Sequence, residues 1–292
     1  MSDLPVVGIL GGSGLYEMPG LAGVEERRVE TPFGEPSDAL VLGTLGDVRL
    51  AFLPRHGRGH RIPPHRINFR ANLWALKVVG AQHVISISAV GSLREDIRPG
   101  DLVVVDQFID RTLARPRTFF DEGIVAHVGF ADPVCAALAD VVHAAAKDAT
   151  AAHALSVHRG GTYVCIDGPQ FSTRAESHLF RSWGASVVGM TNLPEARLAR
   201  EAEICYATVA LATDYDCWHE TEEDVTVAAV LAVLAQNVAN AKALVAKAAR
   251  RVPRPRTCPC ASALQHAILT DPKAVPPEAR KRLDLLVRRY LP

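Results

Sequence analysis

Two acidic residues, one position apart, follow an apolar stretch late in the chain, which ends in Thr213-Asp214-Tyr215-Asp216-Cys217-Trp218. In an extended backbone Asp214 and Asp216 point to the same side. Such a pair can bind a metal ion, act as a general acid, or hydrogen-bond to the edge of a purine. His219 and Glu220 follow closely but do not complete a metal-ligand spacing. A metal site is therefore disfavoured, while a general acid pair and a purine edge both remain open; a carboxylate can accept from an exocyclic amine, and a protonated carboxyl can donate to N7.

Groups that bind anions follow four other apolar stretches. They are Ser13 in the glycine loop, Arg55 with His56, Ser88 with Ala89, and Thr191. Arginine offers a forked, charged donor, histidine a second donor, and hydroxyls and backbone N–H groups the rest. Ligands of parallel α/β sheets bind at the carboxyl ends of strands. The coincidence predicts one composite phosphate site, although each group taken singly is equally compatible with a capping or surface role.

The glycine loop Gly11-Gly12-Ser13-Gly14 does not match the dinucleotide fingerprint. The spacing Gly-x-Gly-x-x-Gly is broken by the residues that follow the loop, and the Gly-Lys-Ser/Thr of a P-loop is missing. A plain tight turn remains an alternative to an anion cradle. The broken fingerprint argues against a dinucleotide-dependent oxidoreductase. A non-catalytic nucleotide-binding module stays open.

Charge and hydropathy exclude other classes of function. The chain has 32 basic and 32 acidic residues, so we expect no nucleic-acid partner. The basic segment 55–66 lacks the interleaved aromatics of a single-strand binder and is more typical of an active-site loop. Apolar runs are too short for a membrane span, and residues 1–5 do not resemble a signal peptide, so we expect a cytoplasmic protein.

The six cysteines allow two interpretations. Most are expected to be reduced and buried. Cys258-Pro259-Cys260 differs, since two thiols separated by one residue cannot form a tetrahedral zinc site alone. A local redox pair, or a bond from one of them to a distant cysteine, is the alternative. We therefore expect no metal and no organic cofactor.

Strands and helices must position these groups. Apolar runs that end at turns or polar groups predict strands at 6–10, 49–53, 83–87, 102–105, 162–166 and 207–212. Helical spacing predicts helices at 67–79, 132–151, 194–202, 225–250 and 276–290, the second of them starting at Asp132-Pro133. Strands that recur between helices indicate an α/β fold with a largely buried sheet.

The composition changes near Val252, where Val252-Pro253-Arg254-Pro255-Arg256 ends the longest helix. We predict one domain over residues 1–251. Residues 252–292 form a C-terminal extension that carries the Cys-x-Cys and a terminal helix. This extension could cover an active site, brace an oligomer or pack on the surface.

Several motifs together resemble the trimeric purine nucleoside phosphorylase family, and within it the branch that cleaves 5′-methylthioadenosine. The resemblance covers about residues 6–250, and the Cys-x-Cys is similar to that of some microbial members. The motifs are Gly-Gly-Ser-Gly-Leu (11–15), Arg-His-Gly (55–57), Asn-Phe-Arg-Ala-Asn (68–72), Ala-Val-Gly-Ser-Leu-Arg (89–94), Gly-Asp (100–101), Asp-Gln-Phe-Ile-Asp-Arg-Thr (106–112), Gly-Pro-Gln-Phe-Ser-Thr-Arg-Ala-Glu (168–176), Met-Thr (190–191) and Thr-Asp-Tyr-Asp-Cys-Trp (213–218).

The resemblance implies the nucleoside phosphorylase fold, with a central mixed sheet flanked by helices, and a homotrimer or a dimer of trimers. It implies roles for individual residues, with hydroxyls at 13 and 88 where threonine is common in the family. Phosphate would be bound by Ser13, Arg55, His56, Ser88, Ala89 and Thr191. The nucleoside would be bound by Phe171, Ser172, Met190, Asp214, Asp216, by Val227, Val230 and Leu231 around the methylthio group, and by His127 of a neighbouring subunit.

The implied reaction is a pentosyl transfer in purine and methionine salvage, with phosphate as co-substrate. Phosphate would attack the anomeric carbon while Asp214, beside Asp216, gives N7 a proton; this requires a carboxyl pKa raised by burial. The products would be adenine and 5-methylthioribose 1-phosphate. A 6-oxopurine nucleoside or methylthioinosine phosphorylase is the alternative, and two carboxylates argue against it because O6 is an acceptor.

Overall fold

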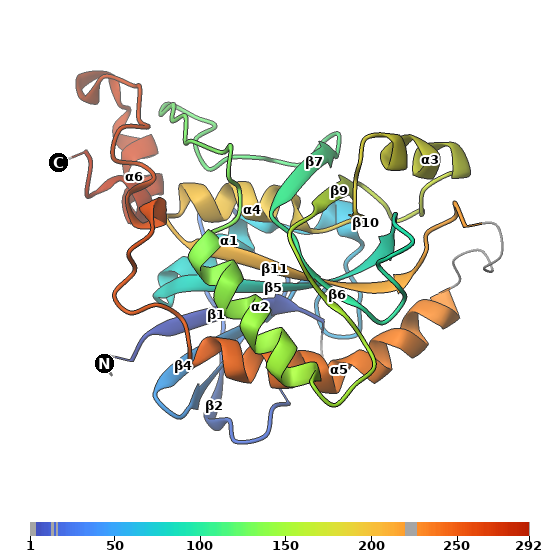
Figure 1. Ribbon diagram of the computed structural model, residues 1–292. Helices are drawn as coiled ribbons and strands as arrows, with labels where there is room; N and C mark the ends of the chain where they lie inside the picture. The colour runs from blue at the N-terminus through green and yellow to red at the C-terminus, as the bar shows by residue number, and fades with distance from the viewer. Residues whose placement is uncertain (1–3, 13–14, 16, 220–226, 292) are drawn as a thin grey trace.

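We analysed a computed structural model of the 292-residue chain, which describes residues 4–12, 15, 17–219 and 227–291; for 227–237 it describes the backbone alone. The described residues form one mixed sheet with helices on both faces (Figure 1). The strands are β1 (Val6–Gly11), β2 (Ala22–Arg27), β3 (Leu40–Leu45), β4 (Val48–Pro54), β5 (Ala81–Ser92), β6 (Leu102–Val104), β7 (Gln107–Arg111), β8 (Val157–Arg159), β9 (Thr162–Ile166), β10 (Val187–Gly189) and β11 (Cys205–Asp214).

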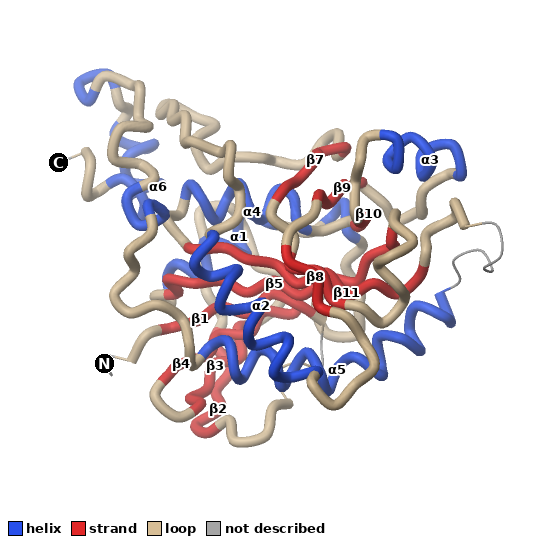
Figure 2. Tube along the Cα trace, in the orientation of Figure 1, coloured by secondary structure: helices blue, strands red, loops and turns tan. Residues whose placement is uncertain are grey.

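The helices are α1 (Phe69–Val78), α2 (Ala136–Thr150), α3 (Arg174–Ser182), α4 (Asn192–Glu201), α5 (Val227–Ala249) and α6 (Pro277–Val287). Single 3-10 turns occur at η1 (Pro64–Arg66), η2 (Pro259–Ser262) and η3 (Pro272–Ala274). Figure 2 shows the strands in the middle of the molecule, with α4 on one side of them and α2 and α5 on the other.

The long strand β5 organises the sheet. It pairs in parallel with β1 and with β11, and its last residues pair antiparallel with β10. The order β2-β3-β4-β1-β5-β10-β9-β7 runs along one path, while β11, β6 and β8 branch from β5. Because β5 and β11 are parallel, their carboxyl ends lie at the same edge of the sheet, which is where ligands bind in such folds.

Alternating side chains of the central strands fill two cores. In β1, Val6 and Leu10 face α1 and α4, whereas Val7 and Ile9 face α2 and α5. All six residues of β1 are buried, as a strand covered by helices on both faces requires. The sheet is therefore held rigidly from both sides, and the groups at its edge have fixed positions.

The C-terminal extension, residues 252–292, packs against the α1 and α4 face. Leu264, Leu283 and Leu286 belong to the same buried cluster as the residues of α1 and α4. Ile268 forms a β-bridge with Ala126 in the long loop after β7. Figure 1 shows α6 beside that loop, at the end of the molecule away from α3.

All six predicted strands and five predicted helices are present, and the α/β fold with a buried mixed sheet is confirmed. One helix start was wrong. The helix α2 begins at Ala136 with Cys135 as its N-cap, so Asp132-Pro133 lies in the preceding loop. Within the described part of the chain, no helix combines the length and apolarity that a membrane span requires.

Candidate active site

Two of the predicted residues, Ser88 and Asp214, lie toward the carboxyl ends of the paired strands β5 and β11. In the parallel register Ser88 lies opposite Ala210, and Gly91 lies opposite Asp214. Three residues along an extended strand span about 10 Å. Ser88 and Gly91 thus mark two positions on one strand, one beside the hydroxyl groups and the other beside the acidic pair.

The acidic pair is close together, although its backbone is not extended as predicted. The strand β11 ends at Asp214, and Asp216 has a positive φ of 52°. The backbone N–H of Asp216 donates to Oδ1 of Asp214 at 2.8 Å, and the Thr213 hydroxyl donates to Oδ2 at 2.6 Å. The turn after the strand, rather than the pleat of the strand, brings the two carboxyl groups to one place.

Asp216 carries an unused acceptor. Its side chain is buried, and among the described residues its Oδ2 has no hydrogen-bond partner. A buried carboxylate oxygen without a partner costs free energy. A left-handed conformation at a non-glycine residue adds to that cost. Both features are typical of a side chain held ready for a ligand.

Gly91 makes room for the pair. A Cβ atom at this position would lie 3.0 Å from Oδ1 of Asp214 and 3.1 Å from Cβ of Asp216. Both distances are tighter than ordinary van der Waals contact. Neither atom can move away easily, because Oδ1 of Asp214 accepts from the Asp216 amide and Cβ of Asp216 is attached to the backbone. Glycine at position 91 is therefore part of the geometry of the acidic pair.

Burial raises the pKa of both carboxyl groups. For Asp214, burial outweighs the hydrogen bonds from Thr213 and from the amide of Asp216. For Asp216, burial is again the largest cause; the Ser177 hydroxyl lowers the pKa, and the charge of Asp214 raises it. The predicted raised pKa is confirmed, and burial is the main reason for it. Such a carboxyl group can hold a proton closer to neutral pH.

The loop that carries the pair is anchored by aromatic and polar contacts. Trp218 donates from its indole nitrogen to the Ser92 carbonyl at 2.8 Å, and the Arg181 guanidinium lies 3.3 Å from the centre of its ring. The Cys217 thiol contacts the Ser172 carbonyl at 3.3 Å. The loop after β11 and the start of α3 are thereby joined, so Ser172 lies beside the acidic pair.

Three hydroxyl groups meet at the predicted phosphate position. Oγ of Ser88 lies 3.1 Å from Oγ1 of Thr191 and 3.2 Å from the Tyr163 hydroxyl. Tyr163 also accepts from the Thr191 backbone N–H at 3.4 Å. Its hydroxyl fits over Gly189, where a Cβ atom would lie 2.1 Å from it. Ser88 and Thr191 are brought together as predicted, and Tyr163 is a partner that the sequence analysis missed.

Most N–H groups of Arg55 bind protein groups, whereas the sequence analysis assigned this side chain to phosphate. Its Nε donates to Glu195 at 2.5 Å, and its Nη1 donates to the Ile87 carbonyl at 3.0 Å. Nη2 contacts the Ser86 hydroxyl at 2.6 Å and the second Glu195 oxygen at 3.2 Å. Both side chains of the ion pair are almost fully buried. A guanidinium has five N–H donors, and the bonds to these protein groups leave one Nη1 hydrogen without a partner among the described residues.

Glu195 is the second residue that the sequence analysis missed. It lies on α4, 140 positions from Arg55, and it also accepts from Ser86 at 3.0 Å and from the Tyr206 hydroxyl at 3.0 Å. The signal available in the sequence was an acidic residue four positions after Thr191 in a helix that packs on the sheet. Glu195 thereby fixes the guanidinium beside Ser86 of β5.

At neutral pH His56 is uncharged, and one of its ring nitrogens can accept a hydrogen bond from a ligand. Burial, and then the charge of Arg55, lowers the pKa of His56 to about 4. Its Nδ1 lies 2.8 Å from the Ile62 carbonyl. A carbonyl only accepts, so in the neutral ring Nδ1 carries the hydrogen and Nε2 has a lone pair. The predicted donor is therefore better suited to accept from a protonated phosphate oxygen.

Met190 and Phe171 lie on two neighbouring segments, which are joined by hydrogen bonds from Arg115 and by the close contact of Met190 with Gly168. Arg115 donates to the Met190 carbonyl at 2.8 Å and to the Asp167 carbonyl at 2.8 Å. A Cβ atom at Gly168 would lie 2.3 Å from Sδ of Met190. Phe171 is 47% exposed, an unusual state for a phenylalanine. Arg115 therefore holds the segment that contains Met190 beside the one that contains Asp167 and Phe171. The exposed part of the Phe171 ring is available for contact with a ligand.

Some predicted residues are not part of this cluster. His127 has an exposed side chain, and its amide donates to the Ala267 carbonyl of the C-terminal extension at 2.8 Å. Ala89 follows Ser88 on β5 and is half-buried. Ser13 lies outside the described residues. For Val227, Val230 and Leu231 the backbone of α5 is described and the side chains are not.

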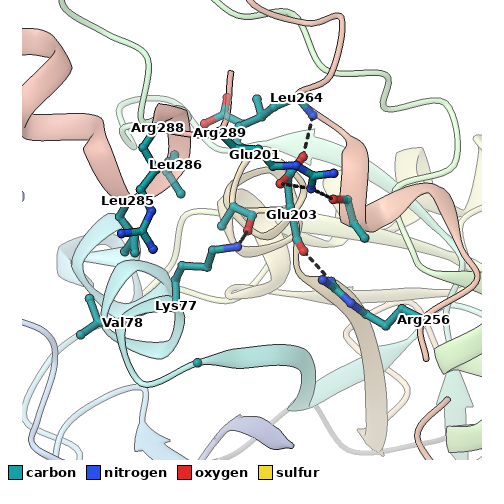
Figure 3. Close-up of a pocket in the computed structure, with 13 residues that line it drawn as sticks. Lys77, Val78, Glu201, Glu203, Arg256, Leu264, Leu285, Leu286, Arg288 and Arg289 are labelled. Atoms are coloured by element: carbon teal, nitrogen blue, oxygen red, sulfur yellow. Dashed lines mark hydrogen bonds and ion pairs between the residues drawn. The ribbon is translucent and has the colours of Figure 1, made fainter. Parts of the chain in front are cut away.

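A cavity of about 410 Å³ lies elsewhere, between α1, the end of α4 and the C-terminal extension (Figure 3). Lys77, Glu203, Arg256 and Arg289 in its lining have partners within the protein. Lys77 donates to the Ala202 carbonyl at 2.6 Å, and Oε1 of Glu203 accepts from the Leu264 amide at 3.1 Å and from the Tyr290 hydroxyl at 2.5 Å. These contacts join the extension to the core, so the cavity is a feature of that junction.

Comparison with known proteins identifies the family of the chain. A profile of the phosphorylase superfamily matches residues 6–250, the part of the chain that carries the acidic pair and the hydroxyl cluster. The chain belongs to the phosphorylase superfamily. The family resemblance seen in the sequence is thereby confirmed.

Similar proteins match over nearly the whole chain. An S-methyl-5′-thioadenosine phosphorylase from Geobacter sulfurreducens is 60% identical over 287 residues, covering 98% of this chain and 99% of the relative. One from Koribacter versatilis is 57% identical over 284 residues, covering 97% of this chain and 96% of the relative. These matches include the C-terminal extension.

Solved structures show the same fold. A methylthioadenosine phosphorylase from an antarctic soil metagenomic library superposes with a TM-score of 0.93 at 46% identity, covering 98% of this chain and 99% of the other. A methylthioadenosine phosphorylase from Schistosoma mansoni in complex with adenine superposes with a TM-score of 0.78 at 42% identity, covering 84% and 91%.

Proposed function

We propose that this protein catalyses the phosphorolysis of 5′-methylthioadenosine to adenine and 5-methylthioribose 1-phosphate. The observation that carries the proposal is the buried pair Asp214 and Asp216, with one oxygen of Asp216 unpartnered, at the end of β11; this strand pairs with β5, which carries Ser88 of the hydroxyl cluster. The relatives with this name, at up to 60% identity, support it.

The acidic pair suits a 6-aminopurine. The unpartnered Oδ2 of Asp216 is an acceptor for the exocyclic amine, while a protonated Asp214 donates to N7. A 6-oxopurine would place its acceptor oxygen against these acceptors. The Schistosoma relative bound to adenine is consistent with the same assignment.

The hydroxyl cluster suits phosphate. Ser88, Thr191 and the remaining Nη1 hydrogen of Arg55 are donors, and Ser13, the backbone N–H of Ala89 and neutral His56 complete the set. In this set His56 accepts a hydrogen bond from a protonated phosphate oxygen. The ribose occupies the space between the two groups, against Met190, Phe171 and Ser172, and Val227, Val230 and Leu231 surround the methylthio group.

The chemistry follows from this placement. A phosphate oxygen forms a bond to the anomeric carbon while the bond from that carbon to N9 breaks, and the electron pair moves into the purine. Asp214 gives N7 its proton as this charge develops, which is the step that a raised carboxyl pKa favours. The negative phosphate stabilises the cationic sugar from the opposite face.

We propose a trimer in which His127 reaches the neighbouring subunit's site. His127 lies outside the cluster of its own chain. Beside it, Val125 and Leu269 are 50% and 65% exposed, and the Leu269 amide donates to the Val125 carbonyl at 2.9 Å. Neighbouring exposed apolar side chains are typical of a surface covered by another subunit.

Release of free base from methylthioadenosine, adenosine, methylthioinosine and inosine, with and without phosphate, tests the proposed function. We expect phosphate-dependent adenine release, fastest from methylthioadenosine. Preference for the inosines would overturn the base assignment. Release without phosphate would identify a hydrolase, and tight binding of methylthioadenosine without turnover would identify a binding protein.

A further inference from the structure

Four of the six cysteines meet at one point of the fold. The sulfur atoms of Cys135, Cys205, Cys258 and Cys260 all lie within 4.8 Å of one another, and those of Cys205 and Cys258 are 3.3 Å apart. All four are free thiols. The spacing of Cys258 and Cys260 alone excluded a tetrahedral metal site, and the fold supplies the two ligands that were missing.

The four thiols come from three separate elements. Cys135 is the N-cap of α2, Cys205 is the first residue of β11, and Cys258 and Cys260 lie at the start of η2 in the C-terminal extension. The first two elements are part of the rigid core. A group that binds all four sulfur atoms would therefore fasten the extension to the core.

The geometry matches one tetrahedral ion. Zinc bound by four thiolates has Zn–S bonds of about 2.3 Å, which places the sulfur atoms about 3.8 Å apart. The observed separations bracket this value. Four cysteines are one of the usual ligand sets of structural zinc, and soft thiolates favour zinc over harder cations.

The surroundings are dry and contain positive charge. Cys135, Cys205 and Cys260 are at most 4% exposed and belong to the apolar core between α2 and α5. His83 is paired in register with Cys205 on the next strand, and among the described residues its buried Nδ1 has no hydrogen-bond partner. It is near enough to Cys135 and to Arg256 for their charges to affect it. The guanidinium of Arg256 can offset part of the negative charge of a zinc tetrathiolate.

The cluster lies far from the candidate active site. Cys205 begins β11 and Asp214 ends it; ten extended residues span about 30 Å. An ion held by all four thiols has no open position for substrate, and structural zinc sites are closed in this way. Its effect would be on stability and on the attachment of the extension.

We propose that Cys135, Cys205, Cys258 and Cys260 bind one Zn²⁺ ion that fastens residues 252–292 to α2 and β11. The ion is bound by thiolates, so its uptake releases thiol protons and involves no oxidation. The site is independent of the catalytic groups, and its presence can be tested apart from the reaction.

The first test measures metal in the untagged full-length protein, purified with reductant, by elemental mass spectrometry. We expect about one zinc per chain. The double variant Cys258→Ala/Cys260→Ala should lose it, whereas Cys217→Ala, which leaves the cluster intact, should keep it. Zinc retained by the double variant would contradict the assignment of the ligands.

The second test does not depend on a variant that folds. Chelator-treated, reduced wild-type protein is titrated with Co²⁺, followed by competition with Zn²⁺. We expect a one-to-one end point with the intense visible bands of tetrahedral cobalt and a thiolate-to-metal charge-transfer band, both removed by zinc. Zinc should also restore a melting temperature that chelation lowers.

Three results would overturn the proposal. One is a reduced protein with four titratable cluster thiols that binds neither Co²⁺ nor Zn²⁺. Another is isolation with two disulfides among these cysteines, shown by the mass of the non-reduced protein. The third is isolation with iron in place of zinc at the same position.

Discussion

At the scale of single residues, the site depends on close contacts between glycine backbones and the side chains packed against them. Gly91 lies against both carboxyl groups, Gly189 against the Tyr163 hydroxyl, and Gly168 against Met190. Each glycine lets a functional side chain approach the backbone of a neighbouring strand or loop. The positions of the catalytic groups are thus set partly by residues that have no functional group of their own.

Substitution of Gly91 tests this. We expect Gly91→Ala to lower kcat/KM for methylthioadenosine at least about 10-fold, since displacement of a catalytic group by a fraction of an ångström is costly. Gly129→Ala is a matched control, because the space around Gly129 is open. Equal kinetics for the two variants would mean that the acidic pair tolerates displacement.

The buried ion pair of Arg55 and Glu195 also acts at this scale. Removal of one partner from a buried pair typically costs about 3–5 kcal/mol, because the other charge is left uncompensated. We expect Glu195→Gln to lower the free energy of unfolding, measured in urea, and to raise KM for phosphate. Glu122→Gln, at a pair whose acid is 74% exposed, should change neither quantity.

At the scale of elements, the last turn of α4 is hydrogen-bonded to the loop after β7. Glu201, in the last turn of α4, accepts from the Phe119 amide at 2.8 Å and from the Thr118 hydroxyl at 2.7 Å. Burial raises the pKa of Glu201 from 4.5 to about 7, although both hydrogen bonds oppose the shift. The ionised form is therefore less stable in the folded protein than in the unfolded chain.

The consequence is a pH dependence with a defined sign. Between about pH 4.5 and 7 the folded state holds the Glu201 proton more tightly, so this group removes stability as pH rises. Burial lowers the pKa of His83 to about 4. Between about pH 4 and 6.5 this histidine therefore adds stability as pH rises, opposite to Glu201. The difference between wild type and Glu201→Gln isolates the glutamate.

We expect Glu201→Gln to be the more stable protein at pH 8, relative to wild type, by up to a few kcal/mol. The advantage should shrink toward pH 5. Urea unfolding at intervals of half a pH unit measures it. A stability difference that is constant with pH would show that Glu201 does not titrate as its burial indicates.

The elements also show what a sequence can predict. Central strands such as β1 and β11 are continuous apolar runs, so they were predicted closely. The edge strand β2 is exposed along its whole length and gives no such signal. The helix α2 was predicted to start at Asp132 because aspartate before proline is a common helix start, yet the chain becomes helical only after Cys135.

The site was predictable where function depends on local residue type. The acidic pair and the hydroxyl residues were identified from their positions after strands. The Arg55–Glu195 pair joins residues 140 positions apart, and the cysteine cluster joins three distant elements. Contacts of this kind form only when the sheet is assembled, so they could not be predicted from local patterns in the sequence.

At the scale of the whole molecule, the trimer proposal predicts that the active site needs two chains. We expect a particle of three times the 31.4 kDa chain mass by light scattering. His127→Ala should raise KM for methylthioadenosine with no change in melting temperature. His153→Ala, at another exposed histidine, is the control. An active monomer, or no effect of His127→Ala, would contradict the shared site.

The central claim is that two buried carboxyl groups recognise a 6-amino base during phosphorolysis. The most direct test is the ratio of kcat/KM for methylthioadenosine to that for methylthioinosine, in wild type and in Asp216→Asn. We predict a wild-type ratio above about 100 and a fall of at least about 10-fold in the variant, because an amide can donate to O6. Asp140→Asn, at an exposed aspartate on α2, should leave the ratio unchanged. Equal loss of activity on both substrates in Asp216→Asn would contradict the claim.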